Sequence, residues 1–174
     1  SPLKPSARDS VGDKERNPGW TFVNIKVGEE ITWTGESGTG WGNPGCWDLG
    51  RAPVDTDTVI IPAGCAAYPH LSAGVSVYEL RMQGGSTLSL EGFPFEVKKS
   101  ATVAGTLVCS AKEQISFLGD VDFTGGGFVA ADSTVTIAGT KAQTVSLGGL
   151  RFNTVVLANT ATATFAAGFE TKRL

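Results

Sequence analysis

The sequence contains few of the residues with which enzymes bind metals or transfer protons. Its 174 residues include one histidine, His70, one methionine, and three cysteines, Cys46, Cys65 and Cys109. Zinc sites use cysteine and histidine ligands at short spacings such as C-x-x-C, and no such spacing occurs here. His70 lies in a proline-containing turn without a nucleophile motif beside it. We therefore expect no metal, no cofactor and no catalytic site.

The sequence also lacks a basic stripe and a long apolar run. Its net charge is −3, and the adjacent lysines Lys98 and Lys99 are not interleaved with aromatic residues. This argues against a nucleic-acid partner. No apolar stretch reaches the roughly 20 residues that a membrane-spanning helix needs. No signal peptide is visible, and the start, SPLKPSARDS, leads us to expect a processed piece of a longer chain.

Short strands of Val, Ile, Leu and Phe fill the sequence from Ser76 onward. They are separated by glycine and small polar residues, as in GGSTLSLEG, ATVAGTLVCS and STVTIAGT. Strand starts recur about every 8–12 residues, which is typical of an all-β sandwich or coil. The pattern predicts an all-β protein with alternating apolar residues inside.

Two all-β folds fit this spacing. The first is an irregular, right-handed parallel β-helix, a solenoid with rungs of roughly 20 residues and a Trp-rich N-terminal cap. The second is a β-sandwich. The hairpin dipeptides Asn-Gly and Asp-Gly are missing from the strand region, which favours the β-helix, whereas Gly-Gly occurs three times and keeps the sandwich open.

Composition divides the chain into three segments. Residues 1–18 mix Pro, Ser and Gly with charges of both signs, which predicts a charged linker. Residues 19–30 alternate apolar and polar side chains and predict a leading strand, which belongs either to this module or to a preceding one. Residues 31–174 form a single β-helical module, whose first part, residues 31–72, we call the opening segment.

The opening segment holds the most specific motif. It reads W-T-G, then W-G-N-P-G-C-W, then P-V-D-T-D-T-V-I-I-P-A-G. It resembles the start of β-helical modules in bacterial surface and secreted proteins, and more distantly the eight-glycine extracellular domain family. The matching positions are Trp33, Gly35, Trp41, Pro44, Trp47, Pro53, Asp57, Val59, Ile61 and Pro62. The stretch from Gln143 to Leu157 resembles later rungs of the same proteins. The resemblance covers residues 31–170 and implies an extracellular or cell-surface location, but no activity.

Cys46 departs from this family pattern, which usually has a small or polar residue there. Cys46 and Cys65 flank the same predicted first strand region. We expect a disulfide between them, with Cys109 as a buried thiol, although three buried thiols remain the alternative.

Four aromatic residues of the opening segment are candidate ligand-binding residues. Trp33, Trp41 and Trp47, with Tyr68 as a similar case, could form an exposed platform for sugar rings. Alternatively, the tryptophans plug the open end of the coil, since an uncapped solenoid exposes apolar surface and strand edges. We favour the cap.

Carboxylates give two further candidate sites. Asp48, Asp55 and Asp57 could hold calcium, although the calcium-loop pattern is absent. The alternative is that Asp55 and Asp57 cap turns by accepting backbone N–H bonds. Asp120 and Asp122 alternate on one strand and share a face, so they could supply a carboxylate pair for glycoside hydrolysis. No motif supports such an enzyme.

Together these features predict a non-catalytic structural or adhesive module of a larger extracellular or cell-surface bacterial protein. Its partners would be neighbouring modules of the same chain, with a polysaccharide or host-surface glycan as a further candidate. One alternative is a carbohydrate-binding module that uses Trp33, Trp41 and Trp47. A weaker alternative is an ancillary fragment of a polysaccharide-degrading enzyme.

Overall fold

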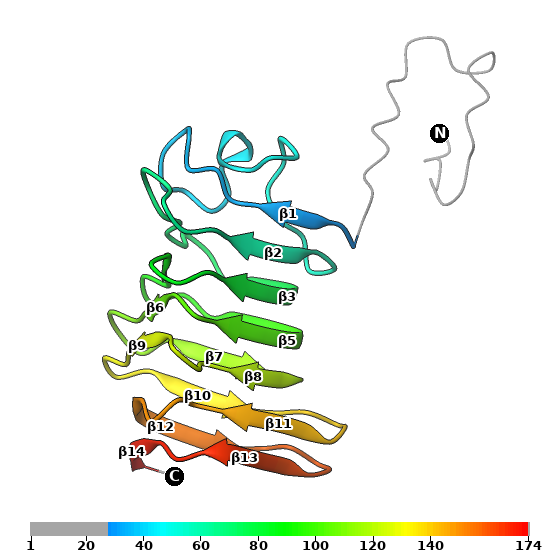
Figure 1. The fold of residues 1–174 in the computed structure, drawn as a ribbon, viewed down its shortest axis with the longest axis vertical. Coiled ribbons are helices and arrows are strands. Elements are labelled where there is room, and N and C mark those ends of the chain that lie inside the picture. Colours follow the sequence, from blue (N-terminus) through cyan, green and yellow to red (C-terminus); the bar gives the residue numbers. More distant parts are fainter. Residues whose placement is uncertain (1–27, 174) are drawn as a thin grey trace, which may run out of the picture.

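A computed structural model describes residues 28–173, which form a solenoid of about six stacked turns (Figure 1). The predicted linker over residues 1–18 and most of the leading strand over residues 19–30 lie outside the described residues. In Figure 1 the coil runs from the opening segment at the top to the red strands at the bottom. No helix in the described part of the chain is long and apolar enough to cross a bilayer.

The coil consists of short strands and one short 3-10 helix. The first turn and its loops contain β1 (Glu30–Thr32), the 3-10 helix η1 (Pro44–Cys46) and β2 (Thr58–Ile61). The coil continues through β3 (Val75–Met82), β4 (Thr87–Ser89), β5 (Phe95–Val103), β6 (Thr106–Val108), β7 (Gln114–Phe117) and β8 (Asp120–Asp122). It ends with β9 (Gly127–Val129), β10 (Thr134–Ile137), β11 (Gln143–Ser146), β12 (Arg151–Leu157), β13 (Ala163–Ala167) and β14 (Glu170–Arg173).

These strands build three walls around one apolar interior. Wall A contains β1, β2, the second halves of β3 and β5, and then β8, β11 and β13. Wall B contains the first halves of β3 and β5, followed by β7, β10 and the second half of β12. Wall C is the three-stranded sheet of β4, β6 and β9. The long strands β3 and β5 bend at a corner and so join walls A and B into one sheet.

Within the described residues, the paired strands of all three walls run parallel. Parallel pairing requires a crossover of many residues between partners, which the other two walls of each turn supply. The predicted parallel β-helix is therefore confirmed, and the β-sandwich is wrong because sandwiches pair their strands antiparallel.

Each turn places an apolar residue directly beneath that of the preceding turn. In wall B, Val97, Phe117 and Ile137 lie in register, and successive members are about twenty residues apart, as predicted. All three are buried, and burying such a side chain stabilises the fold by about 1.5–3 kcal/mol. In wall A, Val121 pairs with Val145, so these two paired residues are more than twenty residues apart. The reason is that the turn before β11 is longer.

The corner between walls A and B contains a β-bulge. The register of β3 and β5 shifts between Val77 and Glu79, so that Tyr78 opposes both Lys98 and Lys99. At this corner β5 has one residue more than β3, and such a bulge bends the strand. The Tyr78 ring remains 42% exposed, and Lys99 Nζ lies 5.4 Å from its centroid.

Wall C contains β9, a strand that the sequence pattern did not predict. β9 is three residues long and begins with Gly127, directly after two further glycines. The Phe128 ring nevertheless stacks on Phe152 at 4.6 Å between centroids. Tertiary packing of this aromatic residue thus outweighs the weak strand propensity of glycine.

Candidate functional site

Three tryptophans of the opening segment form one buried cluster at the N-terminal end of the coil. Trp47 packs edge-on against Trp33 and against Trp41, with ring centroids 5.0 Å apart in both pairs. Trp41 in turn contacts Phe95 of the coil at 6.2 Å. All three indoles are at most 4% exposed. This arrangement supports the cap interpretation, since no indole face is open to a sugar.

Hydrogen bonds fix these rings in place. Trp33 Nε1 donates to the Ala67 carbonyl and Trp47 Nε1 donates to the Trp41 carbonyl, both at 2.8 Å. A buried indole N–H without such a partner would be costly. Tyr68 is half-buried, and its hydroxyl accepts a 3.0 Å bond from the Gly64 amide. The polar atoms of Trp33, Trp47 and Tyr68 are thus engaged within the opening segment.

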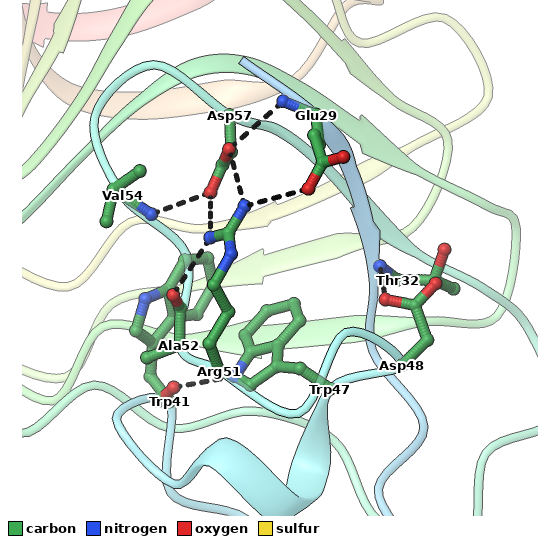
Figure 2. Close-up of polar contacts among 9 residues, drawn as sticks. All are labelled: Glu29, Thr32, Trp41, Trp47, Asp48, Arg51, Ala52, Val54 and Asp57. Carbon is green, nitrogen blue, oxygen red and sulfur yellow. Dashed lines mark hydrogen bonds and ion pairs between the residues drawn. The ribbon is translucent and has the colours of Figure 1, made fainter. Parts of the chain in front are cut away.

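Asp57 is the polar centre of the opening segment (Figure 2). Its carboxylate is fully buried and binds both terminal nitrogens of Arg51, with Nη2–Oδ1 at 3.0 Å. It also accepts the backbone N–H of Val54 at 2.9 Å and that of Glu29 at 3.2 Å. Burial would raise the pKa of Asp57, but the Arg51 and backbone hydrogen bonds outweigh it and hold that pKa below its ordinary value.

The other two calcium candidates lie elsewhere. Asp48 accepts the Thr32 amide at 2.9 Å, and Asp55 forms an exposed ion pair with Lys98 at 2.6 Å. Among residues 28–173 no three potential metal ligands come together. The structure thus does not gather Asp48, Asp55 and Asp57 into a calcium site. The turn-capping prediction is confirmed for Asp57, which accepts backbone N–H bonds, and Asp55 instead pairs with a lysine.

The expected disulfide between Cys46 and Cys65 is not formed, and all three cysteines are free thiols. The two sulfurs are directed at different carbonyl oxygens: Cys46 Sγ lies 3.6 Å from that of Gly38, and Cys65 Sγ lies 3.8 Å from that of Trp33. Burial raises the pKa of Cys65, and it raises the pKa of Cys109 to about 12. Both thiols therefore stay protonated at neutral pH and are poor nucleophiles.

His70 lies on the surface. Its ring is 49% exposed, and Nδ1 lies 3.3 Å from Glu91 Oε1. His70 also forms parallel bridges with Gly40 and Ser89, which extend wall C toward the N-terminal end of the coil. No serine or cysteine nucleophile is bonded to it in the described residues.

Glu113 is a buried carboxylate whose role the sequence reasoning missed. It is fully buried and accepts the amides of Gly92 at 2.8 Å, Ser110 at 2.7 Å and Ala111 at 3.0 Å. Burial would raise the pKa of Glu113, but these backbone hydrogen bonds hold it below its ordinary value. The spacing Ser110-x-x-Glu113 is that of a capping box, which was a usable signal, although here it closes a turn between strands.

Asp57 and Glu113 share one structural role. Each directly precedes a strand, β2 or β7, and each accepts the N–H of the residue three positions earlier. Each also accepts an amide from the preceding turn, from Glu29 and Gly92 respectively. These buried carboxylates therefore clamp successive turns together and are committed to structure.

A shallow groove of about 450 Å³ lies on the outer surface of wall A. Its polar lining comes from β5, β8 and β11, namely Ser100, Thr102, Asp120, Asp122, Thr144 and Ser146. The predicted shared face of Asp120 and Asp122 is confirmed, because both carboxylates line this groove. The groove is open to solvent, its small side chains also contribute carbon surface, and the described part of the chain places no histidine or cysteine in its lining.

No family model matches this chain, and no curated protein or solved structure shows significant similarity to it. The resemblance of residues 31–170 to bacterial surface modules therefore rests on the matching residues of the opening segment and of the stretch from Gln143 to Leu157 alone.

Proposed function

We propose that this chain is a non-catalytic structural or adhesive module of a larger extracellular or cell-surface bacterial protein. The observation that carries the proposal is the closure of the N-terminal end of the coil by three buried tryptophans. A capped solenoid presents three regular walls at a fixed spacing and suits a role in holding or spacing other parts of a protein.

The state of the polar groups is consistent with this role. The most buried carboxylates, Asp57 and Glu113, are engaged by backbone amides, and Asp57 also by Arg51. Glu79 is 8% exposed and pairs with Arg81 at 2.8 Å and Lys99 at 3.0 Å. Groups held in this way rigidify the coil.

The rival proposal is a carbohydrate-binding module that uses the tryptophans of the opening segment. In the described structure it would require the cap to open, because Trp47 is 3% exposed and its N–H is already bonded to Trp41. The weaker alternative is an ancillary fragment of a polysaccharide-degrading enzyme. It would also require the cap to open if these tryptophans contacted the sugar.

Substitution of Trp47 separates the two proposals. If the ring is part of a cap, Trp47→Ala should lower the free energy of unfolding by about 3–5 kcal/mol, as buried aromatic truncations do. Tyr78→Ala is the matched control, because this aromatic ring is exposed and contacts Lys99 from outside, so about 1 kcal/mol or less should be lost. Urea unfolding followed by the remaining tryptophan fluorescence measures both.

A glycan array probed with the same variants completes the test. The structural proposal expects that Trp47→Ala changes stability and leaves any glycan binding by the folded protein in place. A Trp47→Ala protein that unfolds like the wild type but loses a glycan signal would overturn it and establish the opening segment as a sugar site.

A further inference from the structure

We infer that the groove on wall A binds a neutral glycan chain. The inference goes beyond the structural role proposed above, which would stand without it, and it does not involve the tryptophans of the cap. It rests on the outward residues of three consecutive turns and on the hydrogen-bonding capacity that the protein leaves unused there.

The groove arises because small residues succeed one another on the outer surface of wall A. Ser100 pairs in register with Asp120, and Thr102 pairs with Asp122, which in turn pairs with Ser146. Further up the same wall, the corresponding positions hold the long side chains Glu79 and Arg81. The wall is therefore hollow from β5 to β11, and Ala166 of β13 continues the lining.

The carboxylates of the groove have acceptor capacity to spare. Asp120 Oδ1 accepts the Thr144 amide at 2.7 Å, and Asp122 Oδ1 accepts the Thr124 amide at 2.8 Å. Within residues 28–173, no hydrogen bond or ion pair reaches the second oxygen of either carboxylate. Each side chain is thus oriented by one bond, and its other oxygen is left to accept from a ligand hydroxyl in a charge-assisted bond.

The hydroxyls beside these carboxylates complete the pattern. In the described structure, the side chains of Ser100, Thr102 and Thr144 have no hydrogen-bond partner within the protein, and each can donate one bond and accept others. Each sugar hydroxyl can both donate and accept hydrogen bonds, so a surface of carboxylates and hydroxyls matches sugars.

Other classes of ligand fit this groove poorly. Nucleic acids and acidic glycans need basic residues, and the lining has two carboxylates and no lysine or arginine. An apolar peptide needs an aromatic or large aliphatic anchor, which the exposed lining lacks. An added β-strand needs an unpaired edge, but β8 is paired on both sides, with β5 and with β11.

The remaining competitor is a divalent cation. Calcium requires six to eight oxygens that converge on one point, according to its usual coordination. Asp120 and Asp122 are two residues apart on an extended strand, which separates their Cα atoms by about 6.6 Å. No third potential metal ligand of the described residues joins them. Successive turns repeat at about 4.8 Å, so the lining suits an extended chain of sugars along the coil better than a single ion.

The test uses the whole chain and a series of neutral hexasaccharides: cellohexaose, mannohexaose, xylohexaose and laminarihexaose. Binding is followed by ¹H–¹⁵N chemical-shift perturbation after a glycan array has shown which linkages are retained. Thr102→Arg places a long side chain across the groove, beside Asp122. Thr136→Arg is the matched control, because Thr136 faces outward from a central strand of wall B, away from the groove.

The inference expects saturable shifts of amides in residues 100–102, 120–122 and 144–146 with at least one neutral glycan. Thr102→Arg should weaken that affinity at least about tenfold, and Thr136→Arg should leave it unchanged. Three results would overturn the inference: no neutral glycan shifts any amide of the folded protein, the shifts map outside the groove, or calcium chloride alone perturbs the groove amides in saturable fashion.

Discussion

Replacing Glu113 tests whether buried carboxylates hold successive turns together. The Glu113→Gln side chain has nearly the same shape and keeps one carbonyl oxygen. It loses the charge, however, and turns an N–H₂ group toward the Ala111 amide, which now donates to Oε2 at 3.0 Å. The variant therefore separates the effect of charge from that of packing.

The expected loss follows from the hydrogen bonds that the carboxylate accepts. Hydrogen bonds to charged groups contribute about 1.5–3 kcal/mol and neutral ones about 0.5–1.5 kcal/mol. Glutamine keeps the bonds to Gly92 and Ser110 as neutral bonds, so we expect a loss of about 1–3 kcal/mol at pH 7. Glu113→Ala should lose more, about 3–5 kcal/mol, because it leaves buried N–H groups without an acceptor.

The pH dependence provides a second measurement. Because the pKa of Glu113 is depressed in the folded protein, its contribution is complete above the ordinary glutamate pKa. It is lost as the pH falls through the folded pKa. Urea unfolding at pH 7 and at pH 3 should therefore show that the stability difference between wild type and Glu113→Gln shrinks at pH 3.

Glu96→Gln is the control, since Glu96 faces outward from wall B and bonds only the Ser76 hydroxyl at 3.0 Å among the described residues. It should change stability by less than about 0.5 kcal/mol. The reasoning is refuted if Glu113→Gln matches the wild type at pH 7, or if the difference between them is the same at both pH values.

Two further predictions concern the contacts between turns. Asp57→Ala removes the buried partner of Arg51 and should cost about 3–5 kcal/mol, whereas Asp55→Ala, which breaks the exposed pair with Lys98, should cost about 1 kcal/mol or less. Equal losses in thermal or urea unfolding would contradict the clamp role of Asp57. Gly119→Ala would bring a Cβ to 1.6 Å from the Lys99 carbonyl oxygen, so the turns must separate and about 1–3 kcal/mol should be lost. In Gly84→Ala the nearest atom is 3.9 Å away, and this control should be neutral or slightly stabilising; a Gly119→Ala protein as stable as the control would show that the turns do not pack this closely.

The fold of this chain could be predicted from its sequence because every turn of the coil follows the same pattern. Inward residues must be apolar and outward residues are free to be polar, so alternation and the spacing of strand starts together predict the walls. Gly127-Phe128-Val129 escaped this reasoning because it begins with the last residue of a three-glycine run, and glycine is depleted in strands. Its position depends on Phe128 stacking against a residue of the next turn.

The polar sites were harder to predict, for a physical reason. Asp57 could be assigned to a turn from its place before a strong strand, but its pairing with Arg51 depends on how the loop between β1 and β2 closes. Glu113 receives Gly92 from the preceding turn, a contact that local spacing does not contain. The disulfide prediction was wrong because closeness along the sequence does not orient two sulfurs toward each other.

The longer turn before β11 has a consequence for how such a coil can acquire insertions during evolution. Although extra residues separate Val121 from Val145, these two residues still pair and both stay buried in the wall. Wall register is therefore independent of the length of the connection at that corner. The coil can accept new loops there, from an epitope to a small domain, and display them at a fixed height along its axis while the walls remain as they are.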